Sequence, residues 1–115
     1  MDDSFKLYNL EVTVTGDPNT FVCSHTPGLA FLVEGENLVF ESNTKFSLYS
    51  LSAILPLLPA KQRATHPNDW MTTDDEIACP DPNCGARFKI KRLEETTFKH
   101  SEVTKLPLSN QENTA

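Results

Sequence analysis

The sequence predicts an α+β fold, in which one main helix packs on a small, largely antiparallel sheet and a polar tail follows. Two observations carry this prediction. Segments with strand character lie on both sides of one segment with helical apolar spacing, in the approximate order β-β-β-α-β-β. The 115 residues suffice for one hydrophobic core. We therefore expect a single α+β domain over residues 1–93 and a polar, disordered tail over residues 94–115.

Five segments have the alternation or the composition of strands. They cover residues 6–15, 29–34, 38–41, 76–79 and 86–93. In the first segment, Leu10, Val12 and Val14 alternate with polar residues, which is the period of a strand buried on one face. Gly35-Glu36-Asn37 separates the second and third segments. Because glycine and asparagine tolerate positive φ, we expect a hairpin there.

The main helix is expected between Lys45 and Leu58. Leucines at three- and four-residue spacing predict a single apolar stripe, formed by Leu48, Leu51, Leu55 and Leu58. Asn43, Thr44 or Ser47 is available to cap the start of the helix. Pro56 lacks a backbone N–H group, so it should kink the helix or end it near Leu55, and Pro59 should stop it.

Charge and composition argue against several classes of function. The formal net charge is −6, so polyphosphate would be repelled and we expect no nucleic-acid partner. The longest apolar stretch, residues 51–58, is far shorter than the roughly 20 residues of a membrane span, so we expect no membrane partner. The acidic N-terminus lacks a secretory-signal pattern, and the three cysteines cannot all pair, so we expect a cytoplasmic protein with reduced thiols. An open sheet edge makes a homodimer an option.

Two loops, residues 23–28 and 79–85, carry the side chains best suited to chemistry. A histidine paired with a carboxylate can move protons near neutral pH, and a thiol nearby can assist. The candidate catalytic residues are therefore His25, Asp81 and Cys79. The simpler interpretation is a surface histidine beside a turn aspartate that accepts backbone N–H bonds.

Three aromatic residues are candidates for binding a substrate, namely Trp70, Phe46 and Tyr49. We expect them in the core or at its rim, because large aromatic side chains dominate cores. The alternative is that they wall an apolar pocket between helix and sheet. Trp70 would reach it from a loop over residues 60–73.

Metal binding is the alternative use of the same loops. Cys23, His25, Cys79 and Cys84 would supply four nitrogen and sulfur ligands, which suits tetrahedral zinc. The Cys-Pro-x-x-x-Cys-Gly turn looks like a zinc knuckle, although its four-residue gap exceeds the commonest two. Cys23 with His25 is also the only local pair for covalent cysteine catalysis. The remaining interpretation treats Cys23 and Cys79 as small buried hydrophobic residues.

The order of several motifs resembles a small family of uncharacterised proteins, mainly bacterial and archaeal with some fungal members. The resemblance covers residues 6–93, and its motifs are the opening strand, the Cys/His loop ending Pro27-Gly28, the Ile54-Leu55-Pro56 helix, Trp70, and Cys79-Pro80-Asp81-Pro82. The family pattern places a Cys-Pro-x-Gly-His loop before the helix and a cysteine at the helix start. Here Phe46 replaces that cysteine, Cys23 lies closer to His25, and Cys84 is extra.

The resemblance implies that any metal site of the family is incomplete in this chain, and it carries no settled activity. It also implies a link to natural-product pathways, where the fungal members occur. We therefore expect a small enzyme or accessory protein without a cofactor. It would act on a small organic molecule by proton transfer, as a lyase, isomerase or cyclase. The alternative is a non-catalytic module that binds zinc or a partner through the Cys/His loops.

Overall fold

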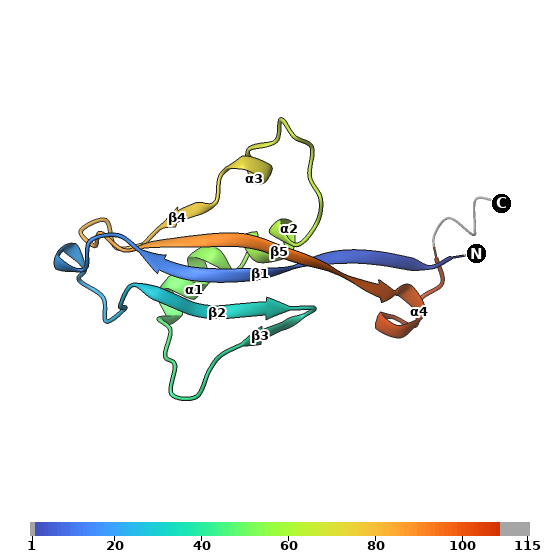
Figure 1. The fold of residues 1–115 in the computed structure, drawn as a ribbon, viewed down its shortest axis with the longest axis horizontal. Coiled ribbons are helices and arrows are strands. Elements are labelled where there is room, and N and C mark those ends of the chain that lie inside the picture. The colour runs from blue at the N-terminus through green and yellow to red at the C-terminus, as the bar shows by residue number, and fades with distance from the viewer. Residues whose placement is uncertain (1, 109–115) are drawn as a thin grey trace.

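The computed structural model describes residues 2–108, and it confirms the α+β class. Its centre is an antiparallel sheet of five strands in the order β3-β2-β1-β5-β4 (Figure 1). The strands are β1 (Ser4–Thr15), β2 (Gly28–Glu34), β3 (Asn37–Val39), β4 (Glu76–Ala78) and β5 (Arg87–Lys99). The two longest strands, β1 and β5, pair along the middle of the sheet.

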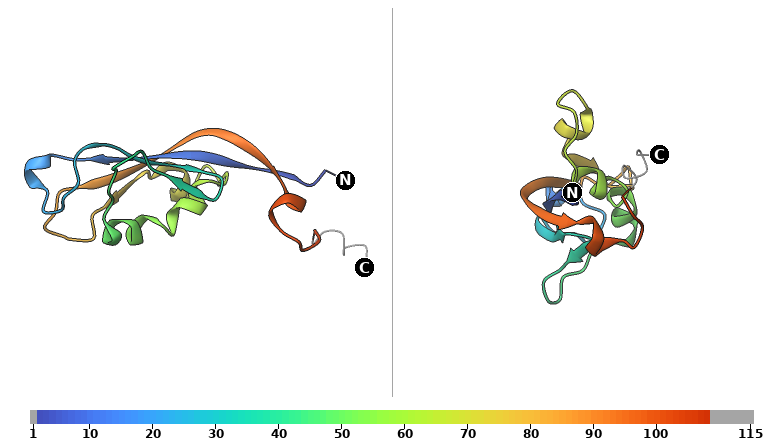
Figure 2. Two further views of the ribbon diagram at one scale, coloured as in Figure 1. Left: turned by 90° about the horizontal axis from the view of Figure 1, so that it is seen from below. Right: turned by 90° about the vertical axis from the view of Figure 1, so that its right-hand side faces the viewer.

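Three short helices, α1 (Leu48–Ile54), α2 (Leu57–Lys61) and α3 (Trp70–Thr73), connect β3 to β4. A fourth, α4 (His100–Val103), follows β5, and a 3-10 turn, η1 (Pro18–Thr20), lies between β1 and β2. Helices α1 and α2 lie together on one face of the sheet (Figure 2, left). Within the described part of the chain, every helix falls short of the length and apolarity needed to cross a membrane.

The core lies between this helical layer and the sheet. The predicted alternation along β1 is confirmed, because Leu10, Val12 and Val14 are all buried. Val12 pairs with Ile90 of β5, so that the buried faces of the two central strands coincide. Phe31 of β2 is buried in the same core. The sheet therefore has one apolar face, and the helices cover it.

The predicted hairpin between the second and third strands is confirmed. Glu34 pairs with Asn37, which leaves a two-residue turn formed by Gly35 and Glu36. Gly35 has a φ of 61°, a conformation that glycine adopts without steric cost. A Cβ atom at Gly35 would also lie 3.3 Å from the ring of Phe98. The turn therefore needs glycine at this position.

The last strand continues beyond the boundary expected at Leu93. Strand β5 runs to Lys99, because its second half pairs with the start of β1, from Tyr8↔Glu95 to Ser4↔Lys99. The expected disorder from residue 94 is thus corrected as far as Leu108; residues 109–115 lie outside the described part. The paired ends of β1 and β5 project from the body of the molecule (Figure 1).

The main helix is divided into two, as the position of Pro56 predicts. Ser47 caps α1, since its Oγ accepts bonds from the backbone N–H groups of Tyr49 and Ser50. The predicted stop at Pro59 is wrong, because Pro59 lies inside α2. There it occupies the first turn of a new helix, where backbone N–H groups have no partner within the helix.

The buried face of these helices matches only half of the predicted leucine stripe. Leu58 is 2% exposed and Leu51 packs against the core, as predicted. Leu48 is 80% exposed and Leu55 is 47% exposed, whereas Ser50 and Ile54 are buried with at most 1% exposed. A pattern of apolar residues does not identify Ser50 as a buried residue. Ser50 can lie on the buried face because its hydroxyl is hydrogen-bonded there, to His25 as described below.

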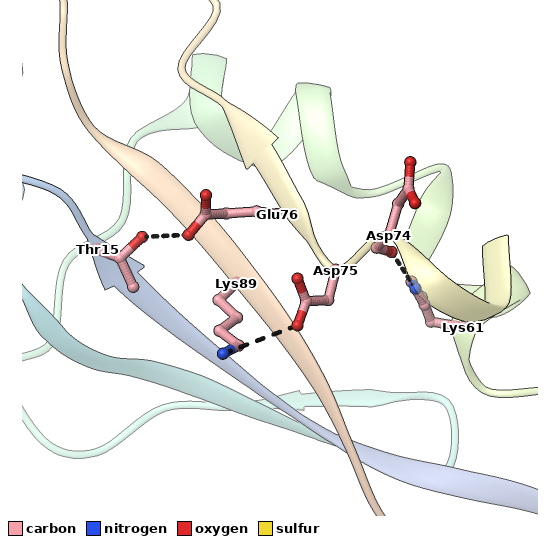
Figure 3. Close-up of polar contacts among 6 residues, drawn as sticks. All are labelled: Thr15, Lys61, Asp74, Asp75, Glu76 and Lys89. Carbon is pink, nitrogen blue, oxygen red and sulfur yellow. Dashed lines mark hydrogen bonds and ion pairs between the residues drawn. The ribbon is translucent and has the colours of Figure 1, made fainter. Parts of the chain in front are cut away.

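A network of polar contacts holds the edge strand β4 to the rest of the fold (Figure 3). Thr15 donates a hydrogen bond to the carboxylate of Glu76, and Lys89 forms a 3.8 Å ion pair with Asp75. The buried ammonium of Lys61 donates to the backbone carbonyls of Met71 and Asp74. Lys61 therefore anchors α3 and the residue that follows it, just before β4.

We expect Lys61→Met to lower the free energy of unfolding by about 1–3 kcal/mol, because two carbonyls lose their donor in a buried place. Urea unfolding measures the change. Lys89→Met is the matched control, since its ion pair is half exposed, and its effect should stay within about 0.5 kcal/mol. Equal effects of the two substitutions would contradict the anchoring role of Lys61.

Candidate functional site

The two loops that carry the cysteines lie at the same end of the sheet. The chain from η1 to β2 carries Cys23, and the turn between β4 and β5 carries Cys79 and Cys84. Both loops are at the end of the sheet opposite the start of β1 and the end of β5 (Figure 1). Two backbone contacts join them, since Gly85 N–H donates to the Thr20 carbonyl and Val22 N–H donates to Cys84 Sγ.

The three sulfur atoms gather around Cys84. The Sγ atoms of Cys23 and Cys84 lie 3.4 Å apart, within hydrogen-bonding distance for sulfur, and Cys84 is close enough to Cys79 to raise the pKa of the Cys79 thiol. Cys79 and Cys84 are buried and Cys23 is half-buried. We call Cys23, Cys79 and Cys84 the thiol cluster. All three thiols are free.

The pKa values of the three thiols are shifted in opposite directions. Burial alone would raise the pKa of Cys84, but N–H groups of Ala86, Cys23 and Val22 and the Cys23 thiol outweigh it and lower the pKa to about 6. Burial raises the pKa of Cys23 and of Cys79, and the neighbouring sulfur of Cys84 adds to both shifts. These directions favour a thiolate at Cys84 and protonated thiols at the other two cysteines.

We expect the ultraviolet absorbance of the thiolate to titrate with a midpoint near pH 6 in the folded protein. The charged form is retained above this midpoint and lost as the pH falls through it, because the hydrogen bonds favour the thiolate. Cys84→Ser should remove this titration, while Cys23→Ala should shift it upwards by removing the side chain that stabilises the Cys84 thiolate. A midpoint above 8 in the wild type would contradict the assignment of the charge to Cys84.

His25 lies beside the thiol cluster in sequence but points to a different partner. Its Nε2 is 3.2 Å from Oγ of Ser50, on the buried face of α1. Its ring packs at 4.6 Å from Phe46 and at 5.2 Å from Phe88, measured between ring centroids. Burial lowers the pKa of His25, so the imidazole is neutral at neutral pH and can accept a proton.

A groove of about 440 Å³ lies beside the thiol cluster and Ser50, the residue that His25 contacts. Its wall contains Cys23 and Cys79 from the thiol cluster, Ser50 from α1, Asp81 and Tyr49. The groove thus brings together side chains from three segments that are far apart in the sequence. Its size is within the range of pockets that hold small organic molecules.

The predicted catalytic residues take different positions around this groove. Cys79 and Asp81 line it, whereas His25 reaches it through the hydroxyl of Ser50. One carboxylate oxygen of Asp81 accepts a 2.9 Å bond from Asn83 N–H, so the aspartate also shapes its own turn, as the simpler interpretation predicts.

The predicted substrate-binding aromatics separate into three environments. Tyr49 lines the groove and is 80% exposed, Phe46 packs against the core, and Trp70 is 60% exposed on α3. The expectation of core positions for Tyr49 and Trp70 is wrong. The helix phase set by the Ser47 cap turns Tyr49 outwards. Trp70 begins a separate short helix capped by Asp69 and is not among the groove residues.

Sequence reasoning missed one residue of the site, Ser50. It gave no signal, because a serine next to a leucine stripe is typical of a solvent-exposed helix position. Cys84 was predicted only as a metal ligand, and the glycine that follows it is a signal for its closer role between the two loops. A Cβ atom at Gly85 would lie 1.9 Å from Oγ of Thr20, so the two loops can approach only with glycine there.

A larger hollow of about 920 Å³ lies between α2, the β2–β3 hairpin and the projecting ends of β1 and β5. Its lining is mainly apolar, and its ionisable residues are Glu34, Glu36 and Arg63. It contains neither a cysteine nor a histidine. We therefore place the candidate chemistry in the smaller groove, where acid and base groups converge.

The residues predicted to bind zinc are only partly together. The thiol cluster unites Cys23, Cys79 and Cys84, while His25 binds Ser50. Among residues 2–108, no group of three or more His, Cys, Asp and Glu side chains is arranged to hold a metal ion. Zinc binding therefore stays a prediction.

Comparison of the chain with protein-family models, with curated proteins and with solved structures finds no match. The family resemblance noted from the motifs therefore stays a prediction, and the geometry alone has to support a function.

Proposed function

We propose that this protein is a small enzyme that moves protons on an organic intermediate bound in the groove, in a reaction of the lyase, isomerase or cyclase type. The observation that carries the proposal is that two proton-transferring groups open onto one groove. One is the Ser50–His25 pair, and the other is the thiol cluster. A reaction that removes a proton at one atom and returns one at another needs such a pair of groups.

The Ser50–His25 pair acts as the base. The neutral imidazole accepts the hydroxyl proton of Ser50 at Nε2 while Ser50 Oγ takes a proton from the substrate. The aromatic rings of Phe46 and Phe88 hold the imidazole in place and exclude water from it. His25 is thus a base that reaches the substrate through one intervening hydroxyl.

The thiol cluster acts as the acid. Cys23 and Cys79 line the groove with their protons in place, since burial raises the pKa of both. A thiol that donates its proton to the substrate becomes a second thiolate, and solvent returns the proton between turnovers. Asp81 lies at the same wall and adds a carboxylate to orient hydroxyl or amino groups of the substrate.

The shape of the site supports a planar, partly apolar substrate. Tyr49 presents an exposed ring at the groove, and a ring of this kind stacks on a conjugated molecule. Loss of a proton next to a carbonyl of such a molecule gives an enolate, from which decarboxylation, dehydration or a double-bond shift follows. Intermediates of natural-product pathways have this chemistry.

The experiment is a screen of turnover by nuclear magnetic resonance. The untagged protein is incubated with a panel of aromatic and aliphatic β-keto acids and β-hydroxy ketones, and loss of carbon dioxide, loss of water and isomerisation are followed. We expect turnover of at least one conjugated member and none with the Ser50→Ala, Cys79→Ser double variant. Turnover by that variant at the wild-type rate would overturn the proposal.

The close approach of Cys23 and Cys84, from the two Cys/His loops, favours a second candidate, a module that binds zinc or a partner through these loops. Metal analysis of the untagged protein separates the two. Stoichiometric zinc that is lost on Cys79→Ser would replace the enzyme proposal. Absence of zinc, with Cys84→Ser harmless to stability, would remove the second candidate.

A further inference from the structure

Cys23 and Cys84 are placed to react with each other as well as with a substrate. Their Sγ atoms lie 3.4 Å apart and come from loops separated by 61 residues in the chain. A disulfide has a sulfur separation of about 2.05 Å, so a side-chain rotation that moves each sulfur by well under 1 Å would suffice.

The surroundings of the two sulfurs suit thiol–disulfide exchange. Cys23 is half-buried and lines the groove, so a small reagent can reach it. Cys84 is buried behind it, and the Val22 N–H group that donates to its sulfur across 3.3 Å favours the thiolate. In thiol–disulfide exchange, an accessible cysteine forms a mixed disulfide with the small reagent. A second, buried cysteine then attacks that mixed disulfide and displaces the small thiol.

We propose that Cys23 and Cys84 form a redox-active pair, which a low-molecular-weight disulfide such as glutathione disulfide converts to an intramolecular disulfide. Cys23, after passing its proton to Cys84, attacks one sulfur of glutathione disulfide and releases one glutathione. Cys84, after giving up a proton to solvent, then attacks Cys23 Sγ and releases the second. The pair, which starts as one thiol and one thiolate, loses two electrons and one proton. Glutathione disulfide gains the two electrons and, with that proton and one more from solvent, becomes two molecules of reduced glutathione.

The bond would change the groove. It would draw Cys23 Sγ away from the lining and remove the thiolate of Cys84, so an oxidised protein keeps Cys79 as the one thiol acid of the groove. It would also close a loop of 61 residues, which restricts the unfolded chain and raises the melting temperature. The redox pair stands on the sulfur geometry and does not depend on the proposed enzymatic activity.

Peptide mapping tests the pair without any variant. Cleavage before each aspartate separates all three cysteines, with Cys23 in residues 17–68, Cys79 in 75–80 and Cys84 in 81–115. After incubation of the full chain with glutathione disulfide, we expect the 17–68 and 81–115 peptides to be joined. The thiol titre of the denatured protein should fall from three to one, with Cys79 the free thiol that remains.

Variants supply the matched controls. Cys79→Ser should still form the bond at a similar rate, and Cys23→Ser should keep both of its remaining thiols or carry a single glutathione. A retained titre of three thiols, or a link between the 75–80 and 81–115 peptides, would overturn the proposal. These results are independent of the turnover screen, so the failure of one leaves the other standing.

Discussion

Replacement of His25 by glutamine is expected to lower turnover by roughly 10²–10⁴-fold, which is the usual contribution of a positioned base. Glutamine fills a similar space and can still hydrogen-bond Ser50, but it cannot accept a proton near neutral pH. The measurement is the rate of conversion of the first substrate found in the screen. His66→Gln is the control, because His66 is exposed and its ring only accepts a local backbone bond.

The pH dependence of turnover adds a second check on the same histidine. Burial lowers the pKa of His25 below the ordinary value of 6.5, so the imidazole stays neutral down to a lower pH than a free histidine would. Activity that depends on His25 should therefore be retained at neutral pH and lost as the pH falls through this lowered pKa. A loss of activity centred above pH 7 would contradict His25 as the base.

Replacement of Phe88 by alanine is expected to lower the free energy of unfolding by roughly 3–5 kcal/mol, the usual cost of emptying a buried phenylalanine position. Phe88 is fully buried, and its ring lies 5.5 Å from Phe46 and 5.2 Å from His25. Such a loss is a large part of the stability of a small domain. Urea unfolding at neutral pH gives the value.

Leu48→Ala is the matched control for this prediction. The predicted leucine stripe would place Leu48 in the core, where the substitution would cost several kcal/mol, whereas its 80% exposure predicts a change within about 0.5 kcal/mol. Ile54→Ala should cost roughly 2–5 kcal/mol from the same helix, because Ile54 is fully buried. Equal costs at Leu48 and Ile54 would contradict the helix phase described above.

The sheet was predictable because its signal is local. The alternation of Leu10, Val12 and Val14 fixes which face of β1 is buried, and Gly35 marks the turn of the hairpin. The extension of β5 past Leu93 was not predictable in this way. Its polar residues are ordered by pairing with the start of β1, a contact between opposite ends of the chain.

The sequence indicates which loops form the site, but it does not indicate which side chains contact each other there. Cys79 and His25 have residue types that suggest chemistry wherever they lie. Ser50 has no such mark, since its role comes from the helix phase and from the direction of the His25 ring. The low pKa of Cys84 likewise comes from N–H groups that only the folded loops bring to its sulfur.

The most direct test of the central claim is the exchange of solvent deuterium into a substrate or inert analogue bound in the groove. Proton removal through Ser50 and His25 predicts deuterium at one carbon when the wild type is incubated in heavy water. Ser50→Ala should slow this exchange at least tenfold while its melting temperature stays within a few degrees of the wild-type value. Exchange at the wild-type rate in both Ser50→Ala and His25→Gln would contradict the claim.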